Sequence, residues 1–341
     1  MRENARWSRR TFLAHAVTGA AATATAPLLS RTAHAASAGY PIKGKTISLI
    51  VPWPPGGPAD ASARILSPVL EETLGVHIEI INRGGAGTQL GMNELVRSRP
   101  DGYTLGQVSL PTLPAVYFNP ERQAVFARKS FQPISMYLND PGALAVRSDS
   151  PYNDLKSLLD AAKANPGKLK VGATGVLTMA HLLVLLLQKA SGAKFSVVQF
   201  DGGGPGLIAL LGGHIDCLSG VLSDVVVRHK GGQVRALVVA GKEPSPFLPD
   251  VKTAEAQGYN IYPLGSSRGW AGPAGTPKEV VEKFDAAVKR AVEDSGVKQK
   301  MEAAGLALYY MPTEAYAANW AEVDGIVRQL FEEEGIKVPT L

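Results

Sequence analysis

Residues 46–60 read TISLIVPWPPGGPAD, and this stretch determines the fold class. β-Branched and apolar residues at 46–51 predict a strand, and the prolines and glycines that follow cannot continue it. Pro58 suits the first position of a helix. Apolar residues then recur at helical spacing until Gly75, which is a helix-terminating residue. The stretch therefore predicts a strand, a tight loop and a helix in succession.

The same unit repeats further along the chain. A strand at 78–81, a glycine loop at 82–87 and a helix to about residue 96 are followed by a turn at 100–102 and a strand at 103–108. Consecutive strand–helix units of this kind build a parallel sheet. We therefore expect an α/β fold.

A second series of units begins near residue 140. It comprises predicted strands at 143–146, 170–173, 195–200, 215–219 and 235–240, helices through 155–162 and from about 178 to 191, and a glycine loop at 202–205. The regular pattern breaks around 259–270, and residues 278–334 are mostly helical with one apolar face. This series predicts a second α/β lobe.

Composition and charge exclude several classes of protein. With 341 residues, 45% hydrophobic and 19% charged, the chain can form sizeable cores, which excludes disorder, collagen and coiled coil. The formal net charge is +5, but residues 1–35 hold five arginines and one glutamate, which leaves +1 for the remainder. Nucleic-acid binding needs a clustered basic surface, and no Lys/Arg run remains after residue 35. We therefore expect no nucleic-acid partner.

Residues 1–35 resemble an export signal. They combine a charged start containing Arg9 and Arg10, an apolar run too short for a membrane anchor and an Ala-His-Ala cleavage site. The arginine pair indicates twin-arginine export, and an ordinary secretory signal with an incidental pair is the alternative. Both routes lead to the periplasm. Cys217 is the only cysteine, so the mature chain has no internal disulfide.

Few residues of the mature chain suit catalysis. Four histidines and Cys217 remain after residue 35, with no spacing typical of zinc, haem or iron–sulfur sites. Residues 265–269 (GSSRG) match the G-x-S-x-G nucleophile pattern, but neither a helix signal nor a histidine follows. We therefore interpret Ser267 as part of a polar inter-lobe loop, and expect no catalytic residue, no cofactor and no metal.

Two glycine loops, at 54–57 and 84–87, each precede a helix. Backbone N–H groups at a helix N-terminus point outward together and attract anions. The second loop nearly matches the dinucleotide pattern G-x-G-x-x-G, but its sixth position is Leu90. Both loops would open at the carboxyl edge of one sheet, where α/β folds bind ligands. They predict an anion cradle, and turn geometry alone is the alternative.

Asp60 and His181 each allow two interpretations. Asp60 falls in the first turn of its helix, where a carboxylate acts as a cap, but it could also fix the loop or bind a ligand. His181 lies three residues after Thr178 at the start of an apolar helix. A lone histidine there is more often structural than functional.

Nine short motifs follow one another along the mature chain. They are residues 40–43 (YPIK), 50–60 (IVPWPPGGPAD), 82–87 (NRGGAG), 100–105 (PDGYTL), 162–168 (AKANPGK), 210–216 (LLGGHID), 234–237 (VRAL), 248–251 (LPDV) and 270–277 (WAGPAGTP). In this order they resemble the tripartite tricarboxylate transporter receptors, the TctC or Bug family. The resemblance covers nearly all of the mature chain.

The resemblance implies a periplasmic-binding-protein-like α/β fold with a ligand cleft between two lobes. Lobe 1 would be formed by residues 36–138 plus 264–341 and lobe 2 by 139–263. The lobes would close by a hinge motion over a small carboxylated solute and deliver it to membrane permease subunits. The implied ligand-binding positions are Pro54, Pro55, Gly56, Asp60, Gly84, Ala86, Gly87 and Ser109 in lobe 1, and Thr174, Gly175, Thr178, His181 and Asp201 in lobe 2.

Two positions depart from the family's pattern. Leu177 replaces a glycine, which removes an easy left-handed position and adds an apolar side chain to the cleft. Asp201 replaces a lysine, which reverses a charge near the ligand and would repel a tricarboxylate, unless Asp201 merely caps the following helix. We therefore expect a monocarboxylate, an amino-acid-like zwitterion or an aromatic acid as the solute.

The sequence as a whole predicts a non-enzymatic, monomeric periplasmic solute receptor. An exported, cofactor-independent enzyme is one alternative, because twin-arginine export carries folded proteins. A sensory adaptor that binds the same solute but signals to a membrane kinase is another. The absence of metal-ligand spacing and of a triad order in the sequence argues against the enzyme.

Overall fold

The opening unit has its expected form in the computed structural model, which describes residues 39–261, 264–333 and 335–339. β1 (Thr46–Val51) ends at the proline loop, and α1 (Pro58–Leu74) begins with Pro58. Gly75 ends α1 in the left-handed region at φ 68°, where its N–H bonds the carbonyl of Glu71. The strand–loop–helix prediction is confirmed. The export-signal prediction lies outside the described residues.

The first group of strands surrounds β1. β2 (His77–Asn82) and β3 (Thr104–Leu110) flank it in parallel, which confirms the predicted parallel sheet. β9 (Gly265–Pro273) then lies antiparallel between β3 and β4 (Phe131–Arg147). The short β10 (Leu308–Met311) pairs with the first half of β4.

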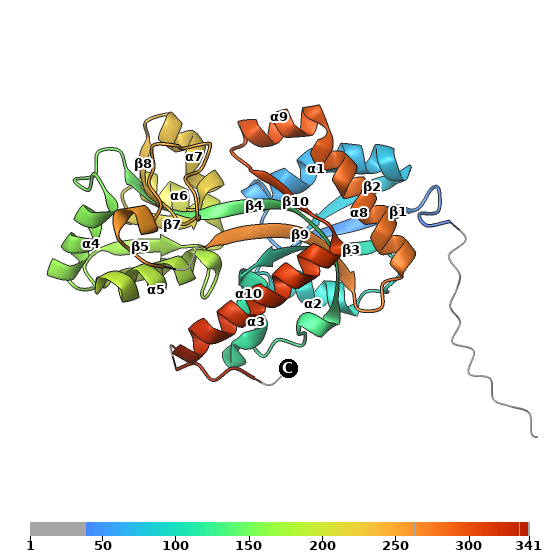
Figure 1. The fold of residues 1–341 in the computed structure, drawn as a ribbon, viewed down its shortest axis with the longest axis horizontal. Helices are drawn as coiled ribbons and strands as arrows, with labels where there is room; N and C mark the ends of the chain where they lie inside the picture. The colour runs from blue at the N-terminus through green and yellow to red at the C-terminus, as the bar shows by residue number, and fades with distance from the viewer. Residues whose placement is uncertain (1–38, 262–263, 334, 340–341) are drawn as a thin grey trace, which may run out of the picture. The chain divides into compact units, whose positions relative to one another are not determined.

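The second group of strands is built on the other half of β4. β7 (Cys217–Val221) and β8 (Val234–Val239) pair antiparallel with it, and β5 (Lys170–Ala173) lies parallel to β7 and β6 (Ser196–Gln199). β4 is 17 residues long and its two halves have different partners, so it runs through both groups (Figure 1). We call the part around β1–β3 the first lobe and the part around β5–β8 the second lobe.

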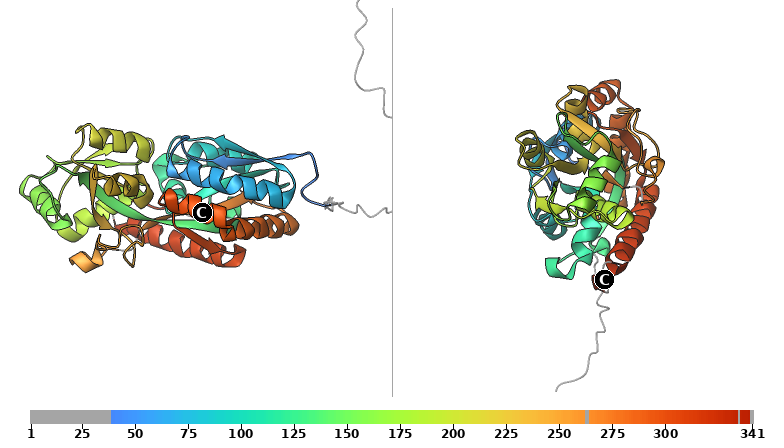
Figure 2. Two further views of the ribbon diagram at one scale, coloured as in Figure 1. Left: turned by 90° about the horizontal axis from the view of Figure 1, so that it is seen from above. Right: turned by 90° about the vertical axis from the view of Figure 1, so that its left-hand side faces the viewer.

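Helices cover both lobes, as the two turned views in Figure 2 show. They are α2 (Gln89–Arg97), α3 (Thr112–Phe118), α4 (Leu155–Ala164), α5 (Met179–Ser191), α6 (Gly203–Leu211), α7 (Leu222–Lys230), α8 (Lys278–Glu293), α9 (Ser295–Ala303) and α10 (Thr313–Glu333). In the first lobe α1 packs against α8 and α9. Among the described residues, no helix combines the length and apolar character that crossing a bilayer requires.

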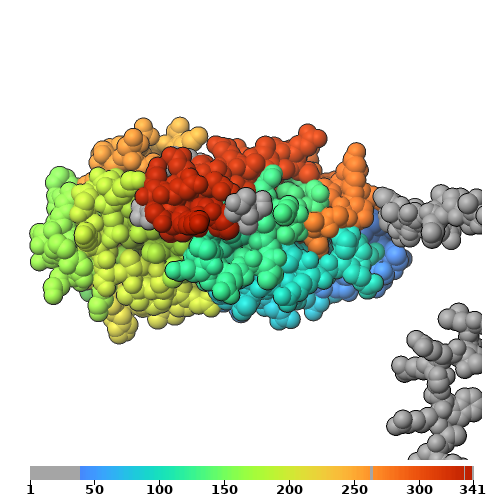
Figure 3. Space-filling view, turned by 90° about the horizontal axis from the view of Figure 1, so that it is seen from below, coloured from blue at the N-terminus to red at the C-terminus, as the bar shows by residue number. Residues whose placement is uncertain are grey.

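The last helix reaches from one lobe to the other. Figure 3 shows α10, in red, between surfaces of the second lobe, in yellow-green, and of the first lobe, in green and cyan. Near its end, Glu333 pairs with Lys189 of α5 at 2.9 Å, and Leu330 and Phe331 line a small apolar cavity with Leu182. The lobes are therefore joined by packing as well as by strands.

The predicted inter-lobe loop at residues 265–269 is wrong, because this segment is the first half of β9. β9 pairs with β4 from Gly265 to Pro273 and also with β3 from Ser267 to Ala271, so its central backbone has a strand on each side. Ser266, Ser267 and Arg268 are buried although they are polar. A strand with polar residues at its centre has no hydrophobic alternation, which is the signal that sequence reasoning uses to find strands.

Smaller boundary differences occur in the second lobe. Gly203 and Gly204 form the first turn of α6 and not a loop, and the strand expected at 215–219 is β7 at Cys217–Val221. The segment predicted to be mostly helical forms α8, α9 and α10 over Lys278–Glu293, Ser295–Ala303 and Thr313–Glu333, with the short β10 inserted. None of these differences moves a loop away from the cavity described below.

Candidate ligand-binding cleft

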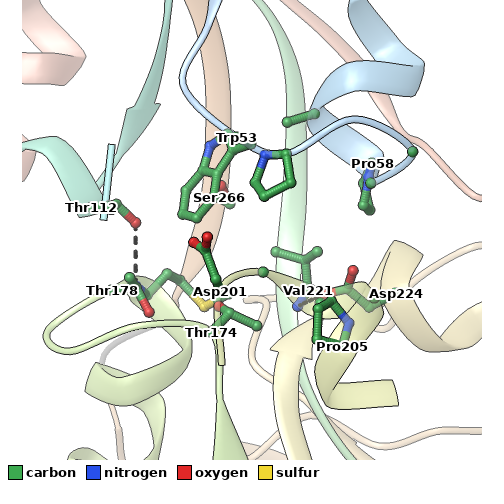
Figure 4. Close-up of a pocket in the computed structure, with 18 of the residues that line it drawn as sticks. Trp53, Pro58, Thr112, Thr174, Thr178, Asp201, Pro205, Val221, Asp224 and Ser266 are labelled. Atoms are coloured by element: carbon green, nitrogen blue, oxygen red, sulfur yellow. Dashed lines mark hydrogen bonds between the residues drawn. The ribbon is translucent and has the colours of Figure 1, made fainter. Parts of the chain in front are cut away.

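A cavity of about 280 Å³ lies between the two lobes, at the carboxyl ends of their parallel strands. The first lobe contributes Trp53 to Ala59 and Thr112. The second lobe contributes Thr174, Thr178 and Met179, the segment Asp201–Pro205 with Ile208, and Val221 and Asp224. Ser266 and Arg268 of β9 complete the lining. Figure 4 shows Trp53 and Pro58 facing Asp201, Pro205 and Asp224 across this space.

The proline loop after β1 is held in place by side chains from neighbouring strands. The Trp53 indole N–H donates to the Ser109 hydroxyl at 3.1 Å, and the Asn82 amide donates to the Trp53 carbonyl at 3.1 Å. Ser109 is buried and does not line the cavity, so its predicted place in the site is that of a support for Trp53.

Asp60 holds the proline loop in place from outside the cavity. Its carboxylate accepts the Gly56 N–H at 2.9 Å, the Arg64 Nε–H at 2.9 Å and an Asn82 amide hydrogen at 3.0 Å. Burial raises the pKa of Asp60, but these hydrogen bonds outweigh burial and hold the pKa below its ordinary value. Asp60 does not line the cavity, and the Gly56 N–H is occupied by Asp60.

The second glycine loop also stands behind the cavity wall. A Cβ on Gly84 would lie 3.0 Å from Pro54, so this glycine allows the two loops to pack together. Gly87 has φ 60°, and a Cβ there would lie 3.9 Å from the Thr178 methyl of the second lobe. Gly84 therefore packs against the proline loop and Gly87 lies close to the other lobe, and Gly84, Ala86 and Gly87 do not line the cavity.

The start of α5 forms one edge of the second-lobe wall. The Thr178 hydroxyl donates to the Gly175 carbonyl at 2.9 Å, and the Met179 N–H donates to the Thr112 hydroxyl of the first lobe at 3.4 Å, the dashed contact in Figure 4. Thr174 and Thr178 line the cavity, whereas Gly175 does not.

His181 supports this turn and not the cavity. Its Nδ1 accepts the Leu177 N–H at 3.0 Å, which fixes Nδ1 as the unprotonated nitrogen, and burial lowers the pKa of His181. Leu177 has φ 61°, a left-handed value that a glycine would adopt more easily, and its side chain is buried among leucines. The hydrogen bond to His181 and this packing hold the strained turn.

Asp201 lies on the cavity wall. Its carboxylate points toward the Trp53 side of the cavity in Figure 4. The N-cap of α6 is Gly202, and no side-chain hydrogen bond caps that helix. The geometry therefore favours the cleft position of Asp201 over the capping alternative.

Sequence reasoning missed three charged residues at the cavity: Asp224 and Arg268 line it, whereas Asp140 is buried beside Arg268 and does not. Asp140 accepts the Ser223 N–H at 3.2 Å and also the Ser223 hydroxyl, and lies 3.5 Å from the Arg268 guanidinium. Asp224 accepts the Val221 N–H at 3.2 Å. Burial and the nearby Asp140 raise the pKa of Asp224 to about 7. The sequence feature that could have pointed to Arg268 was its positive charge, but we interpreted segment 265–269 as a loop.

Arg268 is unusual because it is 4% exposed and its Nε and Nη1 have no acceptor among the described residues. A buried guanidinium normally has all its N–H groups bonded. No group of three or more histidine, cysteine or acidic side chains in the described part of the chain could hold a metal ion. Arg268 lines the cavity and therefore brings a positive charge with unused hydrogen-bond donors to a site that also contains the Asp224 carboxyl group.

The model of the tripartite tricarboxylate transporter family receptor matches residues 62–332 of the chain. This match extends over both lobes, but it begins after the proline loop, so Trp53 to Ala59 of the cavity lining lie outside it. The chain belongs to this receptor family. Its members are periplasmic solute receptors, so the predicted family and the two-lobed fold are confirmed.

Relatives of the receptor agree with this assignment over most of their length. The UPF0065 protein of the gbd 5′ region of Cupriavidus necator is 30% identical over 334 residues, 96% of this chain and 98% of the relative. The periplasmic binding protein BugD is 27% identical with a TM-score of 0.80 over 87% of this chain and 99% of its own. MatC from Rhodopseudomonas palustris, solved with bound malate, is 29% identical with a TM-score of 0.77 over 84% and 99%.

Proposed function

We propose that this receptor binds a small carboxylated organic compound in the cleft and, as a monomer, delivers it to the membrane subunits of a tripartite tricarboxylate-type transporter. The family membership supports the transporter partner. The malate bound to the related MatC supports a carboxylate as ligand. Binding would take place in the periplasm after export.

The observation that carries this proposal is that two positive features line one cavity. The first turn of α1, a helix of 17 residues, contributes Gly57 and Ala59 to the lining, and backbone N–H groups at a helix start are not bonded within the helix. Arg268 contributes guanidinium nitrogens without an acceptor. Helix N-termini and guanidinium groups both stabilise a carboxylate.

The proposed site binds its ligand without a chemical step. Ser267, the serine of the G-x-S-x-G pattern, is buried on β9 and its hydroxyl has no hydrogen-bond partner among the described residues. A serine nucleophile needs a base within hydrogen-bonding distance. This arrangement favours the non-enzymatic interpretation over the exported enzyme.

Thermal shift of the purified mature protein against mono-, di- and tricarboxylates and amino acids tests the binding function. A ligand at 100 times its Kd should stabilise the receptor by about 2.7 kcal/mol. Arg268→Met combined with Asp140→Asn should weaken binding at least about tenfold, whereas the matched control Asp140→Asn alone should not. The double variant avoids a buried unpaired carboxylate. Absence of any shift across the panel would refute the proposal.

Delivery and export are tested in cells. Deletion of the cognate permease subunits should abolish uptake of the ligand while leaving receptor binding intact. Replacement of Arg9 and Arg10 by lysine should retain the precursor in the cytoplasm if export uses the twin-arginine route. Normal periplasmic accumulation of that variant would show the ordinary secretory route instead.

A further inference from the structure

Two aspartates of the second lobe lie on one wall of the cavity. Asp201 follows β6, and Asp224 stands in the first turn of α7. Figure 4 shows both on the side that faces Trp53 and Pro58. No ion pair is formed by either aspartate among the described residues, and Asp224 accepts one hydrogen bond, from the Val221 N–H. The wall therefore presents carboxyl groups without cationic partners of their own.

The Asp224 carboxyl group occupies a space that two glycines leave open. A Cβ on Gly203 would lie 2.0 Å from one Asp224 carboxyl oxygen, and a Cβ on Gly220 would lie 2.8 Å from the other. Gly203 is the first residue of α6. The chain thus places its own carboxylate at the start of α6, where helix N–H groups would otherwise attract an anionic ligand.

The charges around the cavity are unequal. Asp140, Asp201 and Asp224 carry three negative charges when ionised, and Arg268, paired with Asp140 at 3.5 Å, carries one positive charge. A second carboxylate on the ligand would meet repulsion at the second-lobe wall, whereas an ammonium group would be attracted. Arg268 lines the same cavity, and its unbonded nitrogens require a hydrogen-bond acceptor such as a carboxylate.

Much of the remaining cavity lining is apolar, although Thr112, Thr174, Thr178 and Ser266 also belong to it. Trp53, Pro55 and Ile208 contribute their side chains to the apolar part. Apolar groups of a ligand gain free energy by leaving water for such a surface. The cavity therefore combines the carboxyl groups of Asp201 and Asp224, the guanidinium group of Arg268 and an apolar surface.

We propose that the solute is a zwitterion with an apolar body, whose ammonium group binds Asp201 and Asp224 and whose carboxylate binds Arg268 and the start of α1. The inference rests on the proposed function and narrows its substrate class. Asp201 and Asp224 act as specificity-determining residues that reject dicarboxylates.

The titration of Asp224 makes the inference sensitive to pH. The charged groups around Asp224 are Asp140 on β4, Arg268 on β9 and Asp201 on the same wall, and the pKa of Asp224 is about 7 in the free receptor, with burial as the largest cause. An ammonium group favours the ionised carboxylate, so its binding lowers this pKa and releases a proton near pH 7. Affinity for the zwitterion should therefore fall as pH falls from 8 to 6.

Calorimetry with matched ligands tests this inference. The triplets are leucine, 4-methylpentanoate and 3-methylbutylamine, and phenylalanine, 3-phenylpropanoate and 2-phenylethylamine, each with one apolar body. At least one amino acid should bind about tenfold or more tightly than its acid and its amine. Titrations in two buffers of different ionisation enthalpy at pH 7 should reveal proton release for that amino acid.

Variants separate the roles of the two aspartates. Asp224→Asn, which keeps an acceptor for the Val221 N–H, should lose the preference for the amino acid over the acid and also the proton release. Asp201→Asn should reduce the preference and retain the proton release. The exposed Asp250→Asn serves as the control and should behave as the wild type.

Three results would overturn the inference. Neither amino acid binds more tightly than its acid, both amino acids fail to bind, or dicarboxylates are preferred to both amino acids. Failure of the proposed function looks different, because carboxylates and amino acids of every kind would then leave the melting temperature unchanged. A preference for dicarboxylates would retain the receptor function and refute the zwitterion.

Discussion

Asp60 positions the ligand-facing loop without lining the cavity. Its carboxylate joins Gly56, Arg64 and Asn82, which belong to the loop, to α1 and to the end of β2. The residue therefore ties together three segments that meet at the carboxyl edge of the sheet. Of the interpretations that the sequence left open for Asp60, the geometry favours fixing of the loop.

Replacement of Asp60 by asparagine should destabilise the receptor by about 1–2 kcal/mol at pH 7, because charge-assisted hydrogen bonds are replaced by neutral ones. The folded-state pKa of Asp60 is lowered, so this stability is present above the unfolded pKa of about 4 and is lost as pH falls through the folded value. Denaturant unfolding at pH 7 and at pH 3 measures both stabilities.

The difference in free energy of unfolding between Asp60→Asn and the wild type should therefore become smaller as the pH falls toward 3. Asp250→Asn, at an exposed position, is the matched control and should show no such difference. A difference in free energy of unfolding that is the same at both pH values would show that the ionised carboxylate is not the stabilising form.

β9 contributes to both the sheet and the cavity, although its sequence lacks the hydrophobic alternation that would predict a strand. It pairs with β3 and β4 and brings Arg268 and Ser266 to the cavity, while Trp270 stacks on Tyr137 with ring centroids 5.7 Å apart. Close packing against α10 also constrains its glycines. A Cβ on Gly269 would lie 2.5 Å from the Tyr316 ring and 2.6 Å from the Ser135 carbonyl oxygen.

Gly269→Ala should destabilise the receptor by about 1–3 kcal/mol, because the backbone of β4 cannot move away from the added methyl group. Gly325→Ala is the matched control, since Gly325 lies in α10 with open space around it. That control should stabilise the receptor by about 0.5–1 kcal/mol through helix propensity. Equal effects of the two substitutions, measured by thermal unfolding, would contradict the close packing of β9.

At the scale of the whole molecule, the two lobes already contact each other around the start of α5. The Met179 N–H reaches Thr112, and the Arg122 guanidinium donates to the Val176 carbonyl at 3.1 Å. One apolar cluster contains Leu113 of the first lobe and Leu183 of the second. A ligand between the lobes adds to contacts that already join them.

Hydrogen exchange should reveal a ligand that contacts both lobes. At 100 times its Kd, the ligand should slow exchange by up to about 100-fold at the start of α1 and, at the same time, at residues 202–204. Both segments line the cavity from opposite lobes. Slowing confined to one segment would show that the ligand is held by one lobe alone. Amides of α9, remote from the cavity, provide the control.

The sequence by itself determined the α/β class, the strand–loop–helix units and the family. Each of these depends on local patterns: alternating or continuous apolar residues, turn residues at element ends and short motifs in order. It also placed Pro54, Pro55, Gly56, Thr174, Thr178 and Asp201, which the structure brings together on one cavity. Pro54, Pro55 and Gly56 follow a strand that local patterns predict, whereas Thr174, Thr178 and Asp201 were implied by the family resemblance.

Only the tertiary structure decided which charged groups meet at the cavity. Asp224 and Arg268 line it and Asp140 pairs with Arg268, because β4, α7 and β9 come together there. Arg268 lies in a strand that has no hydrophobic alternation, so the sequence did not indicate its position. Asp224 occupies a space that Gly203 and Gly220 leave open. Local patterns report which residues form a strand or a helix, but long-range packing determines which charges share one cavity.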